Sequence, residues 1–271
     1  SQINKQKSIL NWNKKIIKKI LTNKKDYKFR GISTNSKDIK KNNLFIAIKG
    51  KNNDGHKFIS EAIRNGAKFC AVSKLDNKNK NLIKVNNTEI FLKKIALIKR
   101  KMTNATIIAV TGSAGKTTVK DLLGNLLGKY SDTYFSPKSF NNRYGVPISL
   151  ANIEANHRYG VFEVGMSNPG EINKLSRLIK PNIAIITNIA EAHIENFKNI
   201  EGIAKAKSEI INNIEKNGTL ILNQDDFFYS FLSNLAKKRN IKVISFGLNN
   251  NANVYPVNIK KTKHFYIAKI K

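Results

Sequence analysis

The sequence predicts an α/β protein whose larger part is a mostly parallel, doubly wound sheet. From residue 105 onward, short runs of β-branched and apolar residues alternate with segments of helical periodicity. One of these runs, Thr106–Val110, passes directly into a glycine-rich turn and then into a helix-forming segment. Strands that alternate with helices form parallel sheets, which bind ligands at the carboxyl ends of their strands. Functional residues are therefore expected in the loops that follow the strands.

The first hundred residues predict a smaller α/β domain. Apolar residues at helical spacing between positions 8 and 22 predict an amphipathic helix. Strands are expected at 44–48 and 69–72, and further helices at 59–65 and 90–101. The polar segment 100–104 is typical of a linker. Two domains are thus expected, at residues 1–103 and 104–271.

The second domain carries the clearer alternation. Its strands are expected at 107–110, 159–164, 183–187, 219–222 and 242–246, and its helices at 119–127, 172–178 and 200–214. The last two strands, about 254–259 and 265–270, alternate apolar and polar residues. That pattern indicates a terminal antiparallel hairpin.

Composition limits the class of protein. No apolar run approaches the roughly 20 residues that span a bilayer, and the N-terminal residues lack the apolar region of a secretory signal. The single cysteine, Cys70, excludes an internal disulfide framework, and its apolar neighbours favour a buried thiol. These features predict a cytoplasmic protein that does not insert into a membrane.

The formal charge of +31 raises the alternative of a nucleic-acid-binding protein. The lysines, however, are spread over nearly every segment, and no zinc-finger spacing, aromatic RNA-binding signature or helix-turn-helix accompanies them. Such a surface attracts anionic substrates at low salt. We expect no nucleic-acid partner.

The segment Thr111-Gly-Ser-Ala-Gly-Lys-Thr-Thr118 has the layout of a phosphate-binding loop. Gly112 and Gly115 let the backbone bend so that several N–H groups point toward an anion. Lys116 can then reach the β- and γ-phosphates, and the Thr117 hydroxyl can bind Mg²⁺. An ordinary glycine-containing turn would explain the glycines but not the Lys-Thr pair after them. The general pattern of phosphate-binding loops has a further glycine five residues before Gly115, and this chain has Val110 there. The difference limits the families of phosphate-binding protein to which the loop can belong.

Three more candidates follow strands or lie on the next helix. Glu163 ends a predicted strand among apolar neighbours, where an acid needs a partner, and is a natural Mg²⁺ ligand. His193 follows another strand after a short loop, although a lone histidine is more often structural. Lys207 lies on the predicted helix 200–214, and in so lysine-rich a chain it carries little information alone.

Taken together, these motifs resemble the ATP-dependent Mur ligases of peptidoglycan synthesis. The resemblance rests on five segments that occur in one order, 110–118, 140–150, 162–172, 187–193 and 204–210. In the N-terminal part, residues 32–37, 44–50, 54–58 and 66–67 are similar to the family's uridine-nucleotide-binding domain. The resemblance covers most of the chain from about Gly31.

The resemblance implies a set of site residues. The phosphate loop would hold ATP through Gly112, Ser113, Ala114, Gly115, Lys116, Thr117 and Thr118. Thr117 and Glu163 would bind one Mg²⁺, and His193 a second together with Lys207 as a carbamate, which is an anionic oxygen donor. Lys116, Glu163, His193 and Lys207 would be catalytic. Substrate contacts are expected from Ser36, Asp54, His56, Asn141 and Asn142.

The implied reaction is an ADP-forming amide ligation. ATP would phosphorylate the terminal carboxylate of a UDP-N-acetylmuramoyl-tripeptide, and the amine of D-alanyl-D-alanine would attack the acyl phosphate. The family usually has Asp-Ser-Arg where this chain has Asn35-Ser-Lys37, and Ser139, Arg143 and Tyr144 also differ from its usual residues. The family's third domain is not contained in these 271 residues, so the chain alone is expected to have weak or no ligase activity. A monomer is expected. Another ligase of the superfamily, such as a folylpolyglutamate synthetase, and a non-catalytic nucleotide-binding module are the alternatives.

Overall fold

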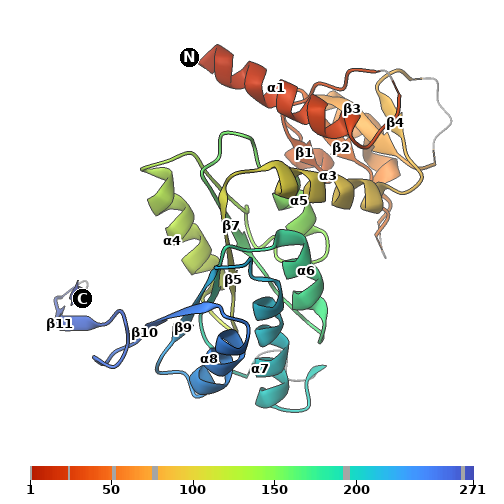
Figure 1. Cartoon of the computed structure of the whole chain (residues 1–271). Coiled ribbons are helices and arrows are strands. Elements are labelled where there is room, and N and C mark those ends of the chain that lie inside the picture. Colours follow the sequence, from red (N-terminus) through yellow and green to blue (C-terminus); the bar gives the residue numbers. More distant parts are fainter. Residues whose placement is uncertain (1, 24, 51–52, 75–78, 192–195, 264–265) are drawn as a thin grey trace. The chain divides into compact units, whose positions relative to one another are not determined.

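The computed structural model describes residues 2–23, 25–50, 53–74, 79–191, 196–263 and 266–271 (Figure 1). It divides into two compact units, one of Ser1–Asn104 with Pro147–His157 and one of Ala105–Val146 with Arg158–Lys271. The segment Pro147–His157 is an addition to the expected first domain. Its Asn152 side chain accepts a hydrogen bond from Ile32 N at 2.9 Å and donates one to Ile32 O at 2.9 Å, which completes an edge strand of the first unit.

The first unit is built on a four-stranded parallel sheet in the order β1-β2-β3-β4. Its strands are β1 Ile32–Ser33, β2 Asn43–Ile46, β3 Ala67–Val72 and β4 Leu82–Lys84. Its helices are α1 Gln2–Lys18, α2 Ile59–Arg64 and α3 Thr88–Met102, with 3₁₀ turns η1 Ser36–Asp38 and η2 Gly55–Phe58. Cys70 lies in the core beside Phe45, and burial raises the pKa of its thiol to about 11. The prediction of a buried thiol is confirmed.

The second unit contains a six-stranded parallel sheet in the order β10-β9-β8-β5-β7-β6. Its strands are β5 Thr106–Thr111, β6 Thr133–Phe135, β7 Tyr159–Glu163, β8 Ile183–Ile186, β9 Thr219–Asn223 and β10 Lys242–Phe246. The chain builds outward from β5 first to β6 and β7 and then to β8, β9 and β10 on its other side. This reversal beside β5 is the switch point at which such sheets bind ligands. The predicted doubly wound sheet is confirmed.

Helices cover both faces of this sheet. On one face, α4 Lys116–Gly128 packs Val119, Leu123 and Leu127 onto the apolar side chains of β5 and β7. Figure 1 shows α6 Glu171–Ile179 on the opposite side of these strands. The helix α5 Gly145–Ala151 begins in this unit, and its residues from Pro147 onward belong to the first unit. Further helices in the described part of the second unit are α7 Ile200–Ser208 and α8 Tyr229–Lys238, and α7 continues as the 3₁₀ turn η4 Glu209–Asn213. The expected single helix over 200–214 is therefore an α-helix with a tighter last part.

The terminal strands β11 Pro256–Lys261 and β12 Tyr266–Ile270 pair in antiparallel fashion, as predicted. The short elements β1, β4, β6 and α5 were not expected from the sequence. The helix α8 was also missed, although Leu232 and Ala236, four residues apart, both face the core. In the part of the chain that the structure describes, no helix is both long and apolar enough to cross a membrane.

Candidate active site

The phosphate loop connects β5 to α4 at the switch point of the large sheet. Gly112 has φ of 147°, and a Cβ atom there would lie 1.9 Å from Thr187 Oγ1. Gly115 has φ of 79° and precedes α4, and a Cβ atom there would have no other atom within 4 Å. The first glycine therefore permits a close approach of the loop to the end of β8. Gly115 allows the chain to turn into α4, and the space beside it is open for a ligand.

The loop is held in shape by the segment that follows β8. Ser113 N donates to Asn188 O at 3.0 Å, and Ala114 N donates to Asn188 Oδ1 at 2.9 Å. Thr187 Oγ1 donates to Ala114 O at 2.6 Å, and Ser113 Oγ donates to Ala190 O at 2.8 Å. Because these bonds form within the chain, the loop conformation exists before any ligand arrives.

The start of α4 presents two sources of positive potential. No side chain caps the helix, so the N–H groups of its first turn are available for an anion. The Lys116 side chain turns back over the loop, and its Nζ donates to Gly112 O at 2.9 Å. A helix N-terminus and an ammonium group on one glycine-rich loop form a site suited to phosphate groups.

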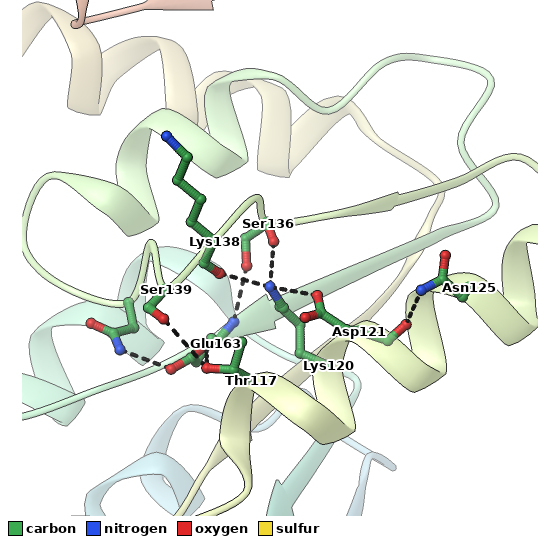
Figure 2. A network of polar contacts seen from close by, with 9 residues as sticks. Thr117, Lys120, Asp121, Asn125, Ser136, Lys138, Ser139 and Glu163 are labelled. Atoms are coloured by element: carbon green, nitrogen blue, oxygen red, sulfur yellow. Dashed lines mark hydrogen bonds and ion pairs between the residues drawn. The ribbon is translucent and has the colours of Figure 1, made fainter. Parts of the chain in front are cut away.

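Thr117 and Glu163 lie together beside this loop. Thr117 Oγ1 donates to Glu163 Oε2 at 2.8 Å (Figure 2). Asn141 Nδ2 donates to Glu163 Oε1 at 2.8 Å. Ser139 Oγ lies 3.4 Å from Thr117 Oγ1. Glu163 is 1% exposed, although its carboxylate has only uncharged hydrogen-bonding partners among the described residues. Hydroxyl, carboxylate and amide oxygens are the ligand types that Mg²⁺ prefers, so the donor set fits this ion.

Lys207 lies on α7 and is 3% exposed. Burial, together with the nearby charge of Lys116, lowers the pKa of Lys207 to about 7. Within the described residues, its amine forms no hydrogen bond or ion pair. Two ammonium groups close together repel each other. The repulsion is relieved when one of the two amines is neutral or when an anion binds between them.

His193 falls outside the described residues, so its predicted metal role stays a prediction. Among the residues that are described, no group of three or more His, Cys, Asp and Glu side chains could hold a metal ion. The candidate Mg²⁺ site thus depends on Thr117 and Glu163 and on oxygens of a bound phosphate.

The two neighbouring asparagines of the substrate loop have different positions. Asn141 contacts Glu163, as described above. Asn142 Oδ1 accepts hydrogen bonds from Tyr144 N at 3.0 Å and Gly145 N at 2.9 Å, and its side chain therefore caps the start of α5. Of these two asparagines, the structure places Asn141 at the Thr117–Glu163 pair and Asn142 at the start of α5.

The candidate substrate residues of the first unit are also engaged in internal hydrogen bonds. His56 Nδ1 lies 2.6 Å from Asp54 Oδ1, and His56 Nε2 accepts from Ser73 N at 2.9 Å. The bond to His56 lowers the pKa of Asp54. Ser36 Oγ donates to Glu61 Oε2 at 2.6 Å. These contacts fix η1 and η2 against α2 and the end of β3.

Sequence reasoning did not single out Thr187, Asn188 or Ser139 as parts of the site. Thr187 and Asn188 lie in the segment 187–193 that carries the family resemblance, and Ser139 is one of the departures from the family's usual residues. The sequence therefore points to their neighbourhood but not to the contacts they make. Their side chains matter because of the atoms they meet in space, Thr187 at Gly112 and Ser139 at Thr117.

Comparisons with known proteins identify the family of the chain. Residues 110–270 match the family model described as the Mur ligase middle domain, and residues 28–111 match the one described as the Mur ligase family, catalytic domain. The UDP-N-acetylmuramoyl-tripeptide–D-alanyl-D-alanine ligase of Rickettsia prowazekii is 44% identical over 220 residues, which are 80% of this chain and 49% of that protein. The same-named ligase of Buchnera aphidicola (subsp. Baizongia pistaciae) is 40% identical over 84% of this chain and 50% of its own length.

Solved structures of Mur ligases are also similar to this chain. A crystal structure of MurF from Acinetobacter baumannii has a TM-score of 0.79 and 28% identity, and the match covers 96% of this chain and 57% of that one. The MurF ligase of Thermotoga maritima in complex with ADP has a TM-score of 0.74 and 31% identity over 91% of this chain and 56% of its own. The chain spans about half the length of the curated relatives it matches. With its phosphate loop, its parallel sheet and two matching family models, the chain belongs to the Mur ligase family.

Proposed function

We propose that this chain binds ATP with Mg²⁺ and supplies the N-terminal and middle parts of a cytoplasmic ligase. The ligase would join D-alanyl-D-alanine to UDP-N-acetylmuramoyl-tripeptide with formation of ADP. The observation that carries the proposal is the preformed phosphate loop with the Thr117–Glu163 pair at its helix, in a chain 44% identical to a ligase of that name. A ligase of the same superfamily, named for 2,6-diaminopimelate addition, is less similar, with 19% identity and a TM-score of 0.54.

The roles of the residues follow from their positions. Lys116 and the first-turn N–H groups of α4 would hold the β- and γ-phosphates, since both present positive potential at one loop. Thr117 and Glu163 would hold Mg²⁺, which neutralises phosphate charge when it is bound. Transfer of a phosphoryl group needs little covalent help from side chains, so these residues would act by positioning and electrostatic stabilisation.

Lys207 would act after a chemical change. A neutral lysine amine can attack CO₂, form a nitrogen–carbon bond and release a proton, which converts the neutral amine into an anionic carbamate. The burial of Lys207 and its position near Lys116 support this assignment, because both disfavour an ammonium group there. The carbamate would then supply oxygen ligands for a second Mg²⁺, together with His193.

The first unit would hold the uridine nucleotide of the peptide substrate. Ser36, Asp54 and His56 lie at the two 3₁₀ turns η1 and η2, which both pack on α2. Since their side chains already bond within the unit, we propose that they shape these turns as well as contact the substrate.

Calorimetric titration of the 271-residue chain with ATP, with and without Mg²⁺, tests the nucleotide part of the proposal. Saturable binding that Mg²⁺ strengthens is expected, whereas no binding at millimolar ATP would contradict it. Titration with UDP-N-acetylmuramoyl-tripeptide tests the substrate part, with UDP-N-acetylglucosamine as the control. A release of ADP that depends on both the tripeptide and D-alanyl-D-alanine, in the ligase that contains this chain, tests the reaction.

A further inference from the structure

Lys120 on α4 has a side chain that is fully buried. Lysines are almost never buried without partners, because the ammonium group loses its hydration. An ammonium group has three N–H donors, and Lys120 has three acceptors. Its Nζ donates to Ser136 O at 2.7 Å and to Lys138 O at 2.7 Å, and pairs with Asp121 Oδ1 at 2.8 Å (Figure 2). Every donor is therefore used.

Both carbonyl acceptors belong to the segment 136–141, which follows β6; we call it the 136–141 loop. This loop places Ser139 3.4 Å from the Thr117 hydroxyl and Asn141 in a 2.8 Å hydrogen bond with Glu163. Its first residue, Ser136, also contacts the strand of Glu163, since Glu163 N donates to Ser136 Oγ at 3.4 Å. The loop thus lies between the buried Lys120 and the candidate Mg²⁺ ligands.

The backbone of the loop is also strained at the point where Lys120 holds it. Lys138 has φ of 51°, in the left-handed region that residues with a side chain rarely adopt. Its carbonyl accepts one of the two Lys120 bonds. Such a conformation persists only when its surroundings compensate for its cost, and the buried ammonium group supplies that compensation.

We propose that Lys120 is a positioning residue of the ligase site. It holds the 136–141 loop so that Asn141 occupies Glu163 Oε1 and leaves Oε2 to Thr117 and a metal ion. Its ammonium group bonds to the loop carbonyls rather than to Thr117 or Glu163, so Lys120 acts through the loop. The inference rests on the proposed binding of Mg²⁺ and ATP at Thr117 and Glu163.

The variant Lys120→Met tests this role, because methionine fills most of the same volume and has no donor. Two variants of the 271-residue chain serve as matched controls. Asp121→Asn removes the charge of the third partner and leaves both loop carbonyls bonded. Lys129→Met removes an exposed lysine at the other end of the same helix. Lys120→Gln keeps two N–H donors and is the variant to use if Lys120→Met does not fold.

Two measurements are made on each variant. Hydrogen–deuterium exchange reports the order of the 136–141 loop, with the amides of β5 and β8 as internal references. Calorimetric titration with ATP reports affinity with and without Mg²⁺.

For Lys120→Met we expect at least tenfold faster exchange in the loop. The gain in ATP affinity from Mg²⁺ should fall at least fivefold, while the metal-free affinity stays within a factor of two. Both controls should match the parent chain in both measurements, and Lys120→Gln should lie between the parent and Lys120→Met.

Unchanged loop exchange in a folded Lys120 variant would overturn the inference. Faster exchange with the full Mg²⁺ effect would also overturn it, because Lys120 would then be a structural residue of the core only. If the parent chain itself shows no Mg²⁺-dependent ATP binding, the proposed function fails. Loop exchange still decides in that case whether Lys120 orders the loop.

Discussion

The hydroxyl of Thr117 donates a 2.8 Å hydrogen bond to Oε2 of Glu163, across 46 residues of sequence. Thr117 belongs to the first turn of the helix after the phosphate loop, and Glu163 ends the strand beside β5. Their meeting point lies at the carboxyl edge of the sheet, where phosphates held by the loop would also arrive. This pair is the geometric basis for the metal-dependent predictions that follow.

Glu163→Gln should abolish the Mg²⁺ effect on nucleotide binding. Glutamine has nearly the same shape and can still accept from Asn141 or Thr117, but it lacks the charge that a divalent cation needs. We expect the Mg²⁺-dependent gain in ATP affinity to fall at least tenfold in calorimetric titrations. The control is Glu171→Gln, another glutamate that follows the same strand but lies on α6. A normal Mg²⁺ response in Glu163→Gln would remove this residue from the metal site.

Lys116→Ala should weaken ATP binding and leave the unliganded fold nearly unchanged. The side chain makes one good hydrogen bond, to Gly112 O, and such a bond contributes about 1 kcal/mol net to stability. We expect ATP affinity to fall at least tenfold, with only a small change in the free energy of unfolding measured in urea. If the affinity stayed within a factor of two of the parent's, a change of about 0.4 kcal/mol, the phosphate-loop assignment would be wrong.

The two loop glycines should differ in their tolerance of a side chain. Gly112→Ala would place Cβ 1.9 Å from Thr187 Oγ1 and should destabilise the fold by about 3 kcal/mol or more, since the loop must move away from β8. Gly115→Ala meets no atom within 4 Å, so only its positive φ costs energy, about 1 kcal/mol. Urea unfolding of both variants measures the difference. Equal losses of unfolding free energy in the two variants would mean that the contact between Gly112 and Thr187 does not restrict the loop.

Lys207 should take up CO₂ at its amine. The chain, incubated with carbon-13-labelled bicarbonate, is expected to show a carbamate resonance in its NMR spectrum that is missing from Lys207→Met. Lys205→Met is the matched control, because Lys205 lies on the same helix with an exposed side chain. In the ligase that contains this chain, Lys207→Ala should abolish ligation, and short carboxylates should partly restore it. Full ligation by Lys207→Ala without additive would remove Lys207 from the site.

A pH-dependent stability is expected from Lys99 of the first unit. The side chain is 2% exposed, and burial lowers its pKa from 10.5 to about 7, against the opposing effect of the Glu154 charge. Because the folded-state pKa lies below the unfolded-state value, the unfolded chain binds more protons above pH 7. The contribution of Lys99 to the free energy of unfolding therefore rises with pH between about pH 7 and 10 and is lowest below pH 7.

Lys99→Met removes this proton-binding site. Between pH 7 and 8.5, the parent chain should gain about 1.5 kcal/mol in unfolding free energy relative to Lys99→Met. Urea unfolding at several pH values measures this difference. Lys94→Met, an exposed position on the same helix α3, should keep the pH dependence of the parent. Identical pH profiles for the parent and Lys99→Met would show that Lys99 is protonated in both states.

Features that depend on neighbours in sequence could be predicted without a structure. The phosphate loop is one of them, because its glycines, its lysine and its threonine lie within eight consecutive residues between a strand and a helix. The parallel sheet is another, since strand and helix periodicity record the face that each segment buries. Short elements such as β1 and β6 have too few residues for any periodicity, and they form because neighbouring strands complete their hydrogen bonds.

Residues of the same type contact different partners, and only the packed structure shows which contact each of them makes. Asn141 and Asn142 have the same side chain, yet one contacts Glu163 and the other caps α5, because successive residues of the loop point in different directions. Lys120 is one lysine among many in the sequence, and only the packing of α4 against the 136–141 loop buries it. Local sequence is enough to set the conformation of the phosphate loop and the longer strands and helices, and it lists the chemical groups available at each position. Distances between residues far apart in the chain arise from packing, and these distances select the side chains that form the site.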